Sequence, residues 1–426
     1  MPQPASFWIG LVALGLVLPG GQNAPVRTGA ELLYEQGWGW LRNRRIGLIT
    51  NHTALLGDTL HLADALARSG VVRLMALFGP EHGIRGAAPA GEPIADERDP
   101  KTGVPVYSLY GPTRKPTPQM LRDVEVLLYD IQDVGARFYT YISTMGLAMQ
   151  AAAQAGIPFV VLDRPNPLGT LVEGPILDTA RVRSFVGLYP IPIVYGLTAG
   201  ELARMIQAEG WLPGLEQLDL RVIPVSNWRR SRTWPDWGRR WVPPSPNIPD
   251  WETALLYPGT CLVEGTTVSE GRGTRAPFRL IGAPWVDGLA LARALNRLNL
   301  PGVRFQDTAF TPVDVPGMAV DPKHKGRRCY GVYITLTEEA RRKPEILQPV
   351  RLGLELVRLL YAQWRVRGQG TAFWRTEAFD RLVGTEAVRQ WIESGNRRAL
   401  WGPRGYALDA ARAFWARTRP YRLYPD

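Results

Sequence analysis

Four apolar segments in the first half of the chain each end in polar or ionisable side chains. In chain order these are Asn51 and His52, then Glu81 and His82, then Asp130, Asp133, Arg137, Tyr139 and Tyr141, and finally Asp163, Arg164 and Asn166. If the apolar segments are parallel strands, their carboxyl ends meet at one edge of the sheet, where open α/β sheets bind ligands. One such side chain alone is usually a helix cap, but four groups in succession favour a functional site.

The carboxylates in this set suit acid–base chemistry, of which glycoside hydrolysis is one example. The reaction needs a proton donor at the leaving oxygen and a second group that acts as base or nucleophile, or a substrate group in that role. Glu81 is the best candidate for the donor, because it follows an apolar segment and Gly83 leaves room for a substrate to approach. Asp130 and Asp133 are candidates for the second group. The structural alternative for Glu81 and Asp130 is a helix cap or a salt bridge, with Arg137 as the partner of Asp130.

Two further segments present polar groups in the second half. Their candidate site residues are Ser245, Asn247, Ser269, Glu270 and Arg272. The stretch 264–274 contains three glycines and two glutamates, which indicates a loop that packs closely. Its structural alternative is a tight turn in which Arg272 pairs with a carboxylate. The stretch 244–249 is stiffened by proline and is either a wall of a cleft between two domains or a plain linker.

Several common active-site patterns do not occur in the sequence. The turn 51–57 lacks the glycine spacing of a dinucleotide site, and there is no phosphate-binding loop. The nucleophile turn of the serine α/β-hydrolases is missing as well. The four histidines are too few and too scattered for a histidine-based metal site. Nucleotide, serine-hydrolase and metal readings are therefore disfavoured.

The alternation of apolar runs with helical periods predicts the elements that carry these residues. In the first half we expect strands at 45–51, 71–78, 104–110, 124–131, 157–162 and 218–225, and helices at 59–69, 139–155 and 198–209. Such an alternation is typical of a doubly wound, Rossmann-like parallel sheet with helices on both faces. In the second half we expect strands at 261–268, 278–281 and 330–337, and helices at 288–298, 350–364, 385–394 and 408–418. This order indicates a smaller α+β domain.

The length of 426 residues suggests two domains, preceded by a targeting segment. Residues 7–18 are apolar and are followed by Pro-Gly-Gly, which predicts a signal peptide over 1–24 and a secreted or periplasmic protein. We assign 25–232 to the Rossmann-like domain and 233–426 to the α+β domain that closes the cleft. No later segment is long and apolar enough to span a bilayer.

Charge and cysteine content constrain the partners only weakly. Lys and Arg number 50 against 39 Asp and Glu, a net charge of +11, but the excess is spread along the chain. With no basic tail and no nucleic-acid signature, a nucleic-acid partner is not expected. Cys261 and Cys329 have no metal-binding spacing and can pair or stay free.

Several motifs in a fixed order resemble a known family. They are FGPEHGIRG at 78–86, DIQDVGARFYTY at 130–141, DRPNP at 163–167, PSPN at 244–247, SEGRGT at 269–274 and GAPW at 282–285. Over roughly residues 30 to 400 the chain resembles the exo-β-N-acetylmuramidases of glycoside hydrolase family 171. The resemblance implies an enzyme that removes a β-1,4-linked N-acetylmuramic acid from the non-reducing end of peptidoglycan fragments, with an active site in the cleft between the domains.

The resemblance also bears on individual residues. It implies that Glu81 is catalytic and that no metal or organic cofactor is needed, and it leaves Asp130, Asp133 and Glu270 open as the second catalytic group. N-acetylmuramic acid carries a lactyl carboxylate, which a guanidinium recognises in a bidentate manner. Arg137, Arg164 and Arg272 are the candidates for that contact, with Arg164 and Arg272 preferred because each lies in a site loop. The alternatives to the enzyme are a non-catalytic muropeptide- or sugar-binding protein and a different hydrolase or esterase with an acidic sugar substrate.

Overall fold

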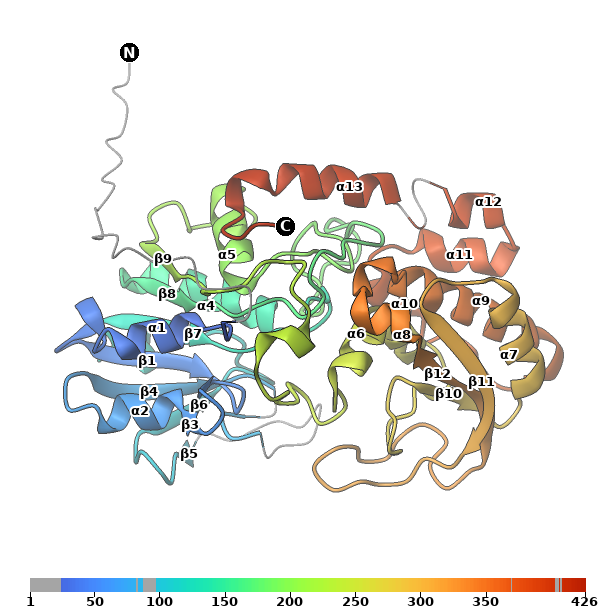
Figure 1. Cartoon of the computed structure of the whole chain (residues 1–426), viewed down its shortest axis with the longest axis horizontal. Coiled ribbons are helices and arrows are strands. Elements are labelled where there is room, and N and C mark those ends of the chain that lie inside the picture. The colour runs from blue at the N-terminus through green and yellow to red at the C-terminus, as the bar shows by residue number, and fades with distance from the viewer. Residues whose placement is uncertain (1–23, 82, 87–96, 369, 403–405, 407) are drawn as a thin grey trace, which may run out of the picture.

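The computed structural model describes residues 24–81, 83–86, 97–368, 370–402, 406 and 408–426, and Figure 1 shows their arrangement. A sheet covered by helices occupies the first half of the chain, and a smaller group of strands and helices lies beside it.

Seven strands form the large sheet, in the order β5-β6-β4-β1-β7-β8-β9. They are β1 (Arg45–Thr50), β4 (Arg73–Gly79), β5 (Glu97–Arg98), β6 (Pro105–Ser108), β7 (Val126–Asp130), β8 (Phe159–Leu162) and β9 (Leu220–Ile223). All neighbours pair in parallel except β5, which is antiparallel to β6. Without β5, the order is the 3-2-1-4-5-6 of the doubly wound Rossmann fold. The predicted fold class is therefore confirmed.

Helices cover both faces of this sheet. They are α1 (Gly29–Glu35) and α2 (Leu62–Arg68) on one face, and α3 (Pro118–Leu121), α4 (Tyr141–Ala155) and α5 (Ala199–Ala208) on the other. Successive strand residues point to opposite faces, so Leu48 and Leu128 pack on the α1 side while Ile49 and Leu127 pack on the α4 side. A strand buried on both faces reads as a continuous apolar run, which is why the sequence located these strands well.

The second half contains a three-stranded antiparallel sheet in the order β10-β12-β11. Its strands are β10 (Leu280–Ala283), β11 (Val303–Phe310) and β12 (Cys329–Leu336). Its α-helices are α6 (Trp251–Thr260), α7 (Gly288–Arg297), α8 (Glu338–Arg342), α9 (Pro349–Arg367), α10 (Thr376–Val383), α11 (Ala387–Ser394), α12 (Arg397–Leu400) and α13 (Leu408–Arg417). The remaining short elements are a hairpin, β2 (Leu55–Leu56) with β3 (Leu60–His61), and five 3-10 turns: η1 (Gly39–Leu41), η2 (Trp234–Trp237), η3 (Cys261–Gly265), η4 (Pro344–Ile346) and η5 (Arg419–Tyr421).

The end of the chain packs back against the first half. Helix α13 runs along the top of Figure 1 from the second half toward α5. Beyond it, the hydroxyl of Tyr424 donates to Asp163 at 2.5 Å, and the amide of Arg230 donates to the carbonyl of Pro425 at 3.0 Å. The two halves are thus joined by the C-terminal segment as well as by the connection 224–250.

The structure corrects two of the expected elements. The segment 261–268, expected as a strand, begins with η3, which continues α6 directly. Gly265 explains the close packing there, since a Cβ at this position would lie 2.5 Å from the Cα of Phe379 on α10. The helix expected over 59–69 begins only at Leu62, because Leu60 and His61 form β3 and the His61 side chain caps α2 by accepting from the amide of Ala63.

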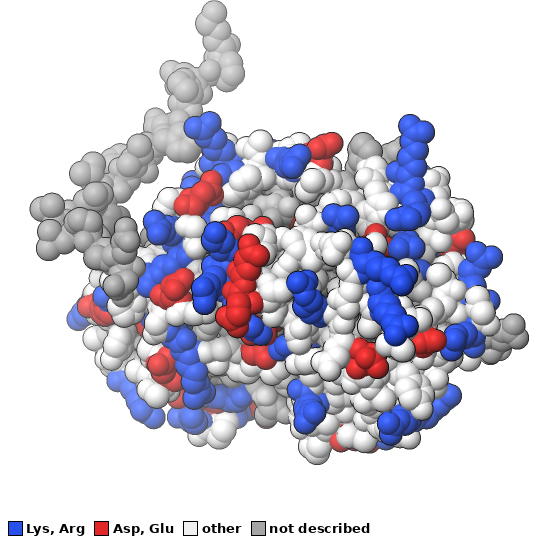
Figure 2. Space-filling model, turned by 45° about the vertical axis from the view of Figure 1, so that its right-hand side comes forward, with Lys and Arg blue, Asp and Glu red and all other residues white. Residues whose placement is uncertain are grey.

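The two cysteines, the helices and the surface charges bear on the remaining predictions from the sequence. Cys261 and Cys329 are both buried free thiols. Among the described residues, no helix combines the length and apolarity that crossing a membrane requires. Figure 2 shows Lys and Arg side chains dispersed over the visible face among acidic and neutral residues.

Candidate active site

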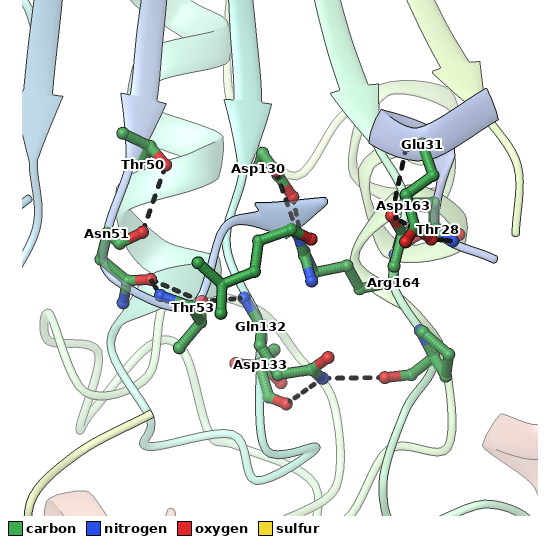
Figure 3. A network of polar contacts seen from close by, with 12 residues as sticks. Thr28, Glu31, Thr50, Asn51, Thr53, Asp130, Gln132, Asp133, Asp163 and Arg164 are labelled. Carbon is green, nitrogen blue, oxygen red and sulfur yellow. Dashed lines mark hydrogen bonds and ion pairs between the residues drawn. The ribbon is translucent and has the colours of Figure 1, made fainter. Parts of the chain in front are cut away.

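The polar groups that follow β1, β7 and β8 meet at one edge of the large sheet, as Figure 3 shows. Most of them bind one another. Arg164 reaches Asp130 with two hydrogen bonds, from Nε at 2.5 Å and from Nη2 at 3.1 Å. Both side chains are buried, so the pair holds the end of β7 to the end of β8. Asp130, a candidate for the second catalytic group, and Arg164, a candidate for carboxylate recognition, are thus paired with each other.

Asp133 is also buried, and it accepts hydrogen bonds from the hydroxyl of Tyr195 and from the amide of Gly135 at 2.7 Å. Burial raises the pKa of Asp133 to about 6, against the opposing effect of these hydrogen bonds. The carboxylate does not line the pocket described below.

Asp163 connects the end of β8 to the start of α5 and to the C-terminal segment. It accepts from the hydroxyls of Tyr424 and Thr198, at 2.5 and 2.7 Å, and from the amide of Gly200 at 2.8 Å. Burial raises the pKa of Asp163 to about 6. Asn166, which follows it, accepts from the amide of Leu168 and donates to a backbone carbonyl of residue 197, both at 2.9 Å. These contacts stabilise the fold around the sheet edge.

Arg137 is fully buried and points away from solvent. Its guanidinium donates to the carbonyls of Pro175, Ile191 and Leu382 at 2.8 to 2.9 Å. Burial without a carboxylate partner lowers the pKa of Arg137 to about 9. Since Leu382 lies on α10, this side chain joins the first half to the second.

The polar residues after β1 are likewise engaged in local contacts. The Asn51 side chain accepts from the amide and the hydroxyl of Thr53, at 3.0 and 2.5 Å. His52 Nε2 lies 2.7 Å from the carbonyl of Pro243 and connects β1 to the proline-rich loop. His82, also predicted for the site, lies outside the described residues.

A pocket of about 650 Å³, partly open to solvent, lies between the two halves and contains Glu81. It is lined by Glu81, Tyr110, Phe138, Tyr139, Thr140 and Val186 from the first half, and by Ser245, Ile248, Tyr257, Cys261, Glu264, Arg272, Phe278 and Leu382 from the rest of the chain. Glu81 follows β4, Tyr110 follows β6 and Tyr139 follows β7, so three strand ends supply this wall. Of the predicted site residues, Glu81, Tyr139, Ser245 and Arg272 are brought together here.

Tyrosines surround the Glu81 carboxylate. Tyr110 shares a hydrogen bond with Glu81, and burial together with the Glu81 charge raises the pKa of Tyr110 to about 12. Burial and the same charge also raise the pKa values of Tyr139 and Tyr141. The Tyr139 and Tyr141 rings meet edge to face with centroids 4.7 Å apart, and the Tyr141 hydroxyl donates to the carbonyl of Pro244 at 2.8 Å. Tyr141 therefore supports the pocket wall from behind.

The second half contributes a chain of alternating charges. Arg272 donates to one oxygen of Glu264 from Nη2 at 2.7 Å and from Nε at 3.0 Å, and its Nε lies 3.6 Å from Glu270. Glu270 in turn pairs with Lys323 at 2.9 Å. Burial by itself would raise the pKa of Glu270, but the charges of Lys323 and Arg272 hold it below its usual value. The two glutamates raise the pKa of Arg272 further above its usual value, against the effect of burial.

The loops beside this chain are held by short-range bonds. Ser245 Oγ accepts from the amide of Asn247 at 3.3 Å, and Asn247 donates to the carbonyl of Met318 at 2.9 Å. Ser269 Oγ accepts from the amide of Gly271 at 3.1 Å. Neither Asn247 nor Ser269 lines the pocket, so both act on its shape.

The structure adds pocket residues that the sequence did not single out. They are Tyr110, Tyr257, Cys261, Glu264 and the supporting Lys323. Glu264 is the first residue of the glycine-rich stretch 264–274. Its pairing with Arg272 is the contact between Arg272 and a carboxylate that was expected from the sequence as the structural alternative for this stretch. Tyr257 lies on α6 and Cys261 begins η3, which follows α6 directly. The sequence pattern predicted neither helix.

No group of His, Cys, Asp or Glu side chains in the described part of the chain has an arrangement that could hold a metal ion. The pocket offers a carboxylate among tyrosines and a second carboxylate that is paired with a guanidinium. Both features suit acid–base chemistry on a polar, uncharged bond.

The fold and the pocket are those of a two-domain α/β protein with a carboxylate site between its halves, and the chain belongs to the exo-β-N-acetylmuramidase NamZ family. The family's N-terminal model matches residues 46–252 and its C-terminal model matches residues 255–424. A curated relative, the peptidoglycan β-N-acetylmuramidase NamZ of Bacillus subtilis strain 168, is 44% identical over 371 residues, which are 87% of this chain and 85% of the relative.

Two solved structures share the whole architecture. Both are described as DUF1343 family proteins from Bacteroides fragilis. One has a TM-score of 0.82 and 37% identity, and covers 94% of this chain and 99% of its own. The other has a TM-score of 0.76 and 36% identity, and covers 95% of this chain and 100% of its own.

Proposed function

We propose that this chain is an exo-β-N-acetylmuramidase that hydrolyses the β-1,4 bond of a non-reducing-end N-acetylmuramic acid in peptidoglycan fragments. Membership of the family and the identity to the Bacillus subtilis relative support the reaction. The observation that carries the assignment to this pocket is the position of Glu81, which lines a cavity between the two halves and is surrounded by tyrosines.

Glu81 acts as the general acid. It donates its proton to the bridging oxygen as the bond from that oxygen to the anomeric carbon breaks, and the remaining fragment leaves with a hydroxyl. A water molecule gives its hydroxyl to the anomeric carbon and its other proton to the second catalytic carboxylate, so the products are N-acetylmuramic acid and the shortened fragment. Proton exchange with solvent then returns both carboxyl groups to their starting states. The hydrogen bond from Tyr110 orients the Glu81 carboxylate for this transfer.

Glu264 is our candidate for the second group. It is the other carboxylate that lines the pocket among the described residues, whereas Asp130 and Asp133 are held at the sheet edge. Glu270 lies behind Arg272 and is paired with Lys323. One oxygen of Glu264 takes both bonds from Arg272, and the other accepts from the Cys261 thiol at 3.7 Å.

Arg272 is our candidate for recognition of the lactyl carboxylate, because Arg137 and Arg164 do not line this pocket and donate to buried protein groups. Arg272 lines the pocket, and its pairing with Glu264 fixes the direction of its guanidinium. If an Arg272→Lys variant keeps the full preference for N-acetylmuramic acid glycosides over N-acetylglucosamine glycosides, this assignment is wrong.

We also propose that the protein acts outside the cytoplasm. The apolar stretch 7–18 and the Pro-Gly-Gly that follows support export, and a peptidoglycan-derived substrate is found there. Cleavage near residue 24 in the natural host, detected by mass spectrometry of the mature N-terminus, tests this proposal.

The decisive experiment is the Glu81→Gln variant, assayed for release of N-acetylmuramic acid from a disaccharide with that sugar at its non-reducing end. We expect loss of release by about 10²–10⁴-fold with an unchanged thermal unfolding midpoint, as for removal of a general acid. Glu216→Gln, an exposed glutamate far along the chain, is the matched control. A wild-type protein that binds the disaccharide in calorimetry but releases no sugar would instead be a binding protein.

A further inference from the structure

A second and larger cavity lies on the three-stranded sheet of the second half. It encloses about 1340 Å³, much of it open to solvent, against about 650 Å³ for the pocket that contains Glu81. Its floor is one face of the sheet, where Leu280, Tyr333 and Gln306 lie side by side on β10, β12 and β11. We call this cavity the sheet groove.

The sheet groove shares a wall with the pocket. Arg272 lines the pocket, and Gly273, the next residue, lines the groove. The chain turns at this point with a positive φ of 75° at Gly273, where a Cβ would lie 2.4 Å from the carbonyl oxygen of Val313. Only glycine fits such a turn. Further along the same wall, Phe278 lines the pocket and Leu280 lines the groove.

The opposite wall of the groove is the arm, which we define as residues 311–328 between β11 and β12. Its start is fixed to the shared wall by the amide of Val313, which donates to Gly273 at 3.0 Å. Its later part packs on residues that support the pocket, because Met318 accepts from Asn247, Lys323 pairs with Glu270, and His324 Nε2 lies 2.8 Å from a backbone carbonyl of the glycine-rich segment. The arm therefore lines the groove with Thr311, Val313 and Val315 and contacts the outer side of the pocket wall.

The groove lining suits a hydroxyl-rich ligand. Hydroxyls of Thr274, Thr308 and Thr311 and the amide of Gln306 offer donors and acceptors, while Tyr333 and Phe310 offer aromatic surface. Arg275 and Asp307 also line the groove and add one charge of each sign. Convergent polar groups on a partly apolar surface are the usual lining of a small-ligand site. Sugars with N-acetyl groups present both kinds of surface.

We infer that the sheet groove binds the saccharides on the leaving-group side of the scissile bond. The inference rests on the proposed function. An exo-acting enzyme binds one terminal sugar in its pocket, and the rest of the saccharide chain has to lie outside that pocket. The groove is larger than the pocket and begins one residue beyond Arg272. Long fragments therefore gain contacts that a terminal sugar with a small leaving group does not make.

The test blocks the groove without touching the pocket. Thr308 lies on β11 with its side chain on the groove face, so Thr308→Trp fills the cavity from its floor. Gln306→Ala removes contacts between this side chain and a ligand in the groove. Because Gln306 is exposed, we expect the variant to fold like the wild type. Arg304→Trp is the matched control, because Arg304 lies on the same strand and face but outside the groove lining.

Each variant is compared with the wild type on two substrates, an aryl glycoside of N-acetylmuramic acid and a tetrasaccharide that begins with this sugar. For Thr308→Trp we expect kcat/KM on the tetrasaccharide to fall about tenfold, which corresponds to about 1.4 kcal/mol, while the aryl glycoside rate changes by less than about twofold. Gln306→Ala should show the same selectivity with a smaller loss, and Arg304→Trp should show none.

Equal losses on both substrates, or no loss on either, would overturn the groove assignment. Since the aryl glycoside needs only the pocket, its hydrolysis also reports that each variant is folded. If the wild type cleaves neither substrate, the proposed function itself is wrong, and this result is distinct from a failure confined to the groove.

Discussion

Tyr110 and Glu81 share a hydrogen bond across the ends of two neighbouring strands, β6 and β4, at the wall of the pocket. The contact places a hydroxyl beside the carboxylate that we assign as the acid. The parallel pairing of these strands fixes both backbones, with Gly79 opposite Ser108 as the last register pair before the two residues.

The Tyr110→Phe variant should lower kcat without unfolding the protein. Glu81 gains negative charge as it gives up its proton, and loss of a hydrogen bond to a charged group costs about 1.5–3 kcal/mol, so kcat should fall by about 10- to 100-fold. Tyr107→Phe is the control, since this half-buried tyrosine of β6 packs its ring 5.7 Å from Phe78 and does not line the pocket. An unchanged kcat in Tyr110→Phe would show that the contact has no part in positioning Glu81.

Replacement of Glu264 by Gln should lower kcat by about 10²–10⁴-fold if Glu264 is the second catalytic group. Glu252→Gln is a close match, because Glu252 is 25% exposed and pairs with Arg341 at 2.7 Å, while Glu264 is 27% exposed and pairs with Arg272 at 2.7 Å. Steady-state kinetics on the disaccharide gives kcat and KM separately. A rise in KM at constant kcat would mean that Glu264 only orients Arg272.

Asp130→Asn should lower the free energy of unfolding and leave kcat nearly unchanged. Removing one partner of a buried ion pair leaves Arg164 uncompensated, which costs about 3–5 kcal/mol in the free energy of unfolding. Denaturant unfolding measures this loss, and we expect kcat of the folded fraction to stay within about threefold of the wild-type value. The double variant Asp130→Asn, Arg164→Met should recover part of the stability. A loss of kcat with full stability would restore Asp130 as a catalytic candidate.

Glu173 predicts a pH-dependent stability. It accepts from the amides of Val350 and Arg351 at 3.0 and 2.9 Å, and burial raises its pKa from the usual 4.5 to about 7. A group whose pKa is raised in the folded state stabilises the fold fully below its unfolded pKa and loses this contribution as pH rises through the folded pKa. The Glu173 contribution should therefore decline between about pH 4.5 and 7.

The measurement is the free energy of unfolding at several pH values for the wild type and for Glu173→Gln. We expect a shallower decline in the variant, since Gln does not titrate. Glu216→Gln serves as control because it is exposed and should keep the wild-type slope. Parallel curves for Glu173→Gln and the wild type would contradict the raised pKa.

The sequence revealed the first half far better than the second. Strands such as β7 and β8 are buried along their whole length, and their continuous apolar runs are visible without any knowledge of neighbours. In the second half, β11 alternates buried and exposed residues irregularly, and α6 contains Pro258 within a helix, so neither pattern stood out. The apolar run at 261–268 was predicted as a strand, because a short buried strand and a short buried helix have the same apolar pattern.

The sequence by itself determined the doubly wound fold, the convergence of polar residues on one sheet edge and the motif that contains Glu81, because strand periodicity and motif order are properties of the linear chain. Only the tertiary structure decided which of those polar residues line the pocket that contains Glu81. Asp130, Arg164 and Arg137 find buried partners across 34 to 245 residues of chain, and Glu264 and Tyr110 reach the pocket from opposite halves. Such pairings depend on distances between segments that no local pattern encodes.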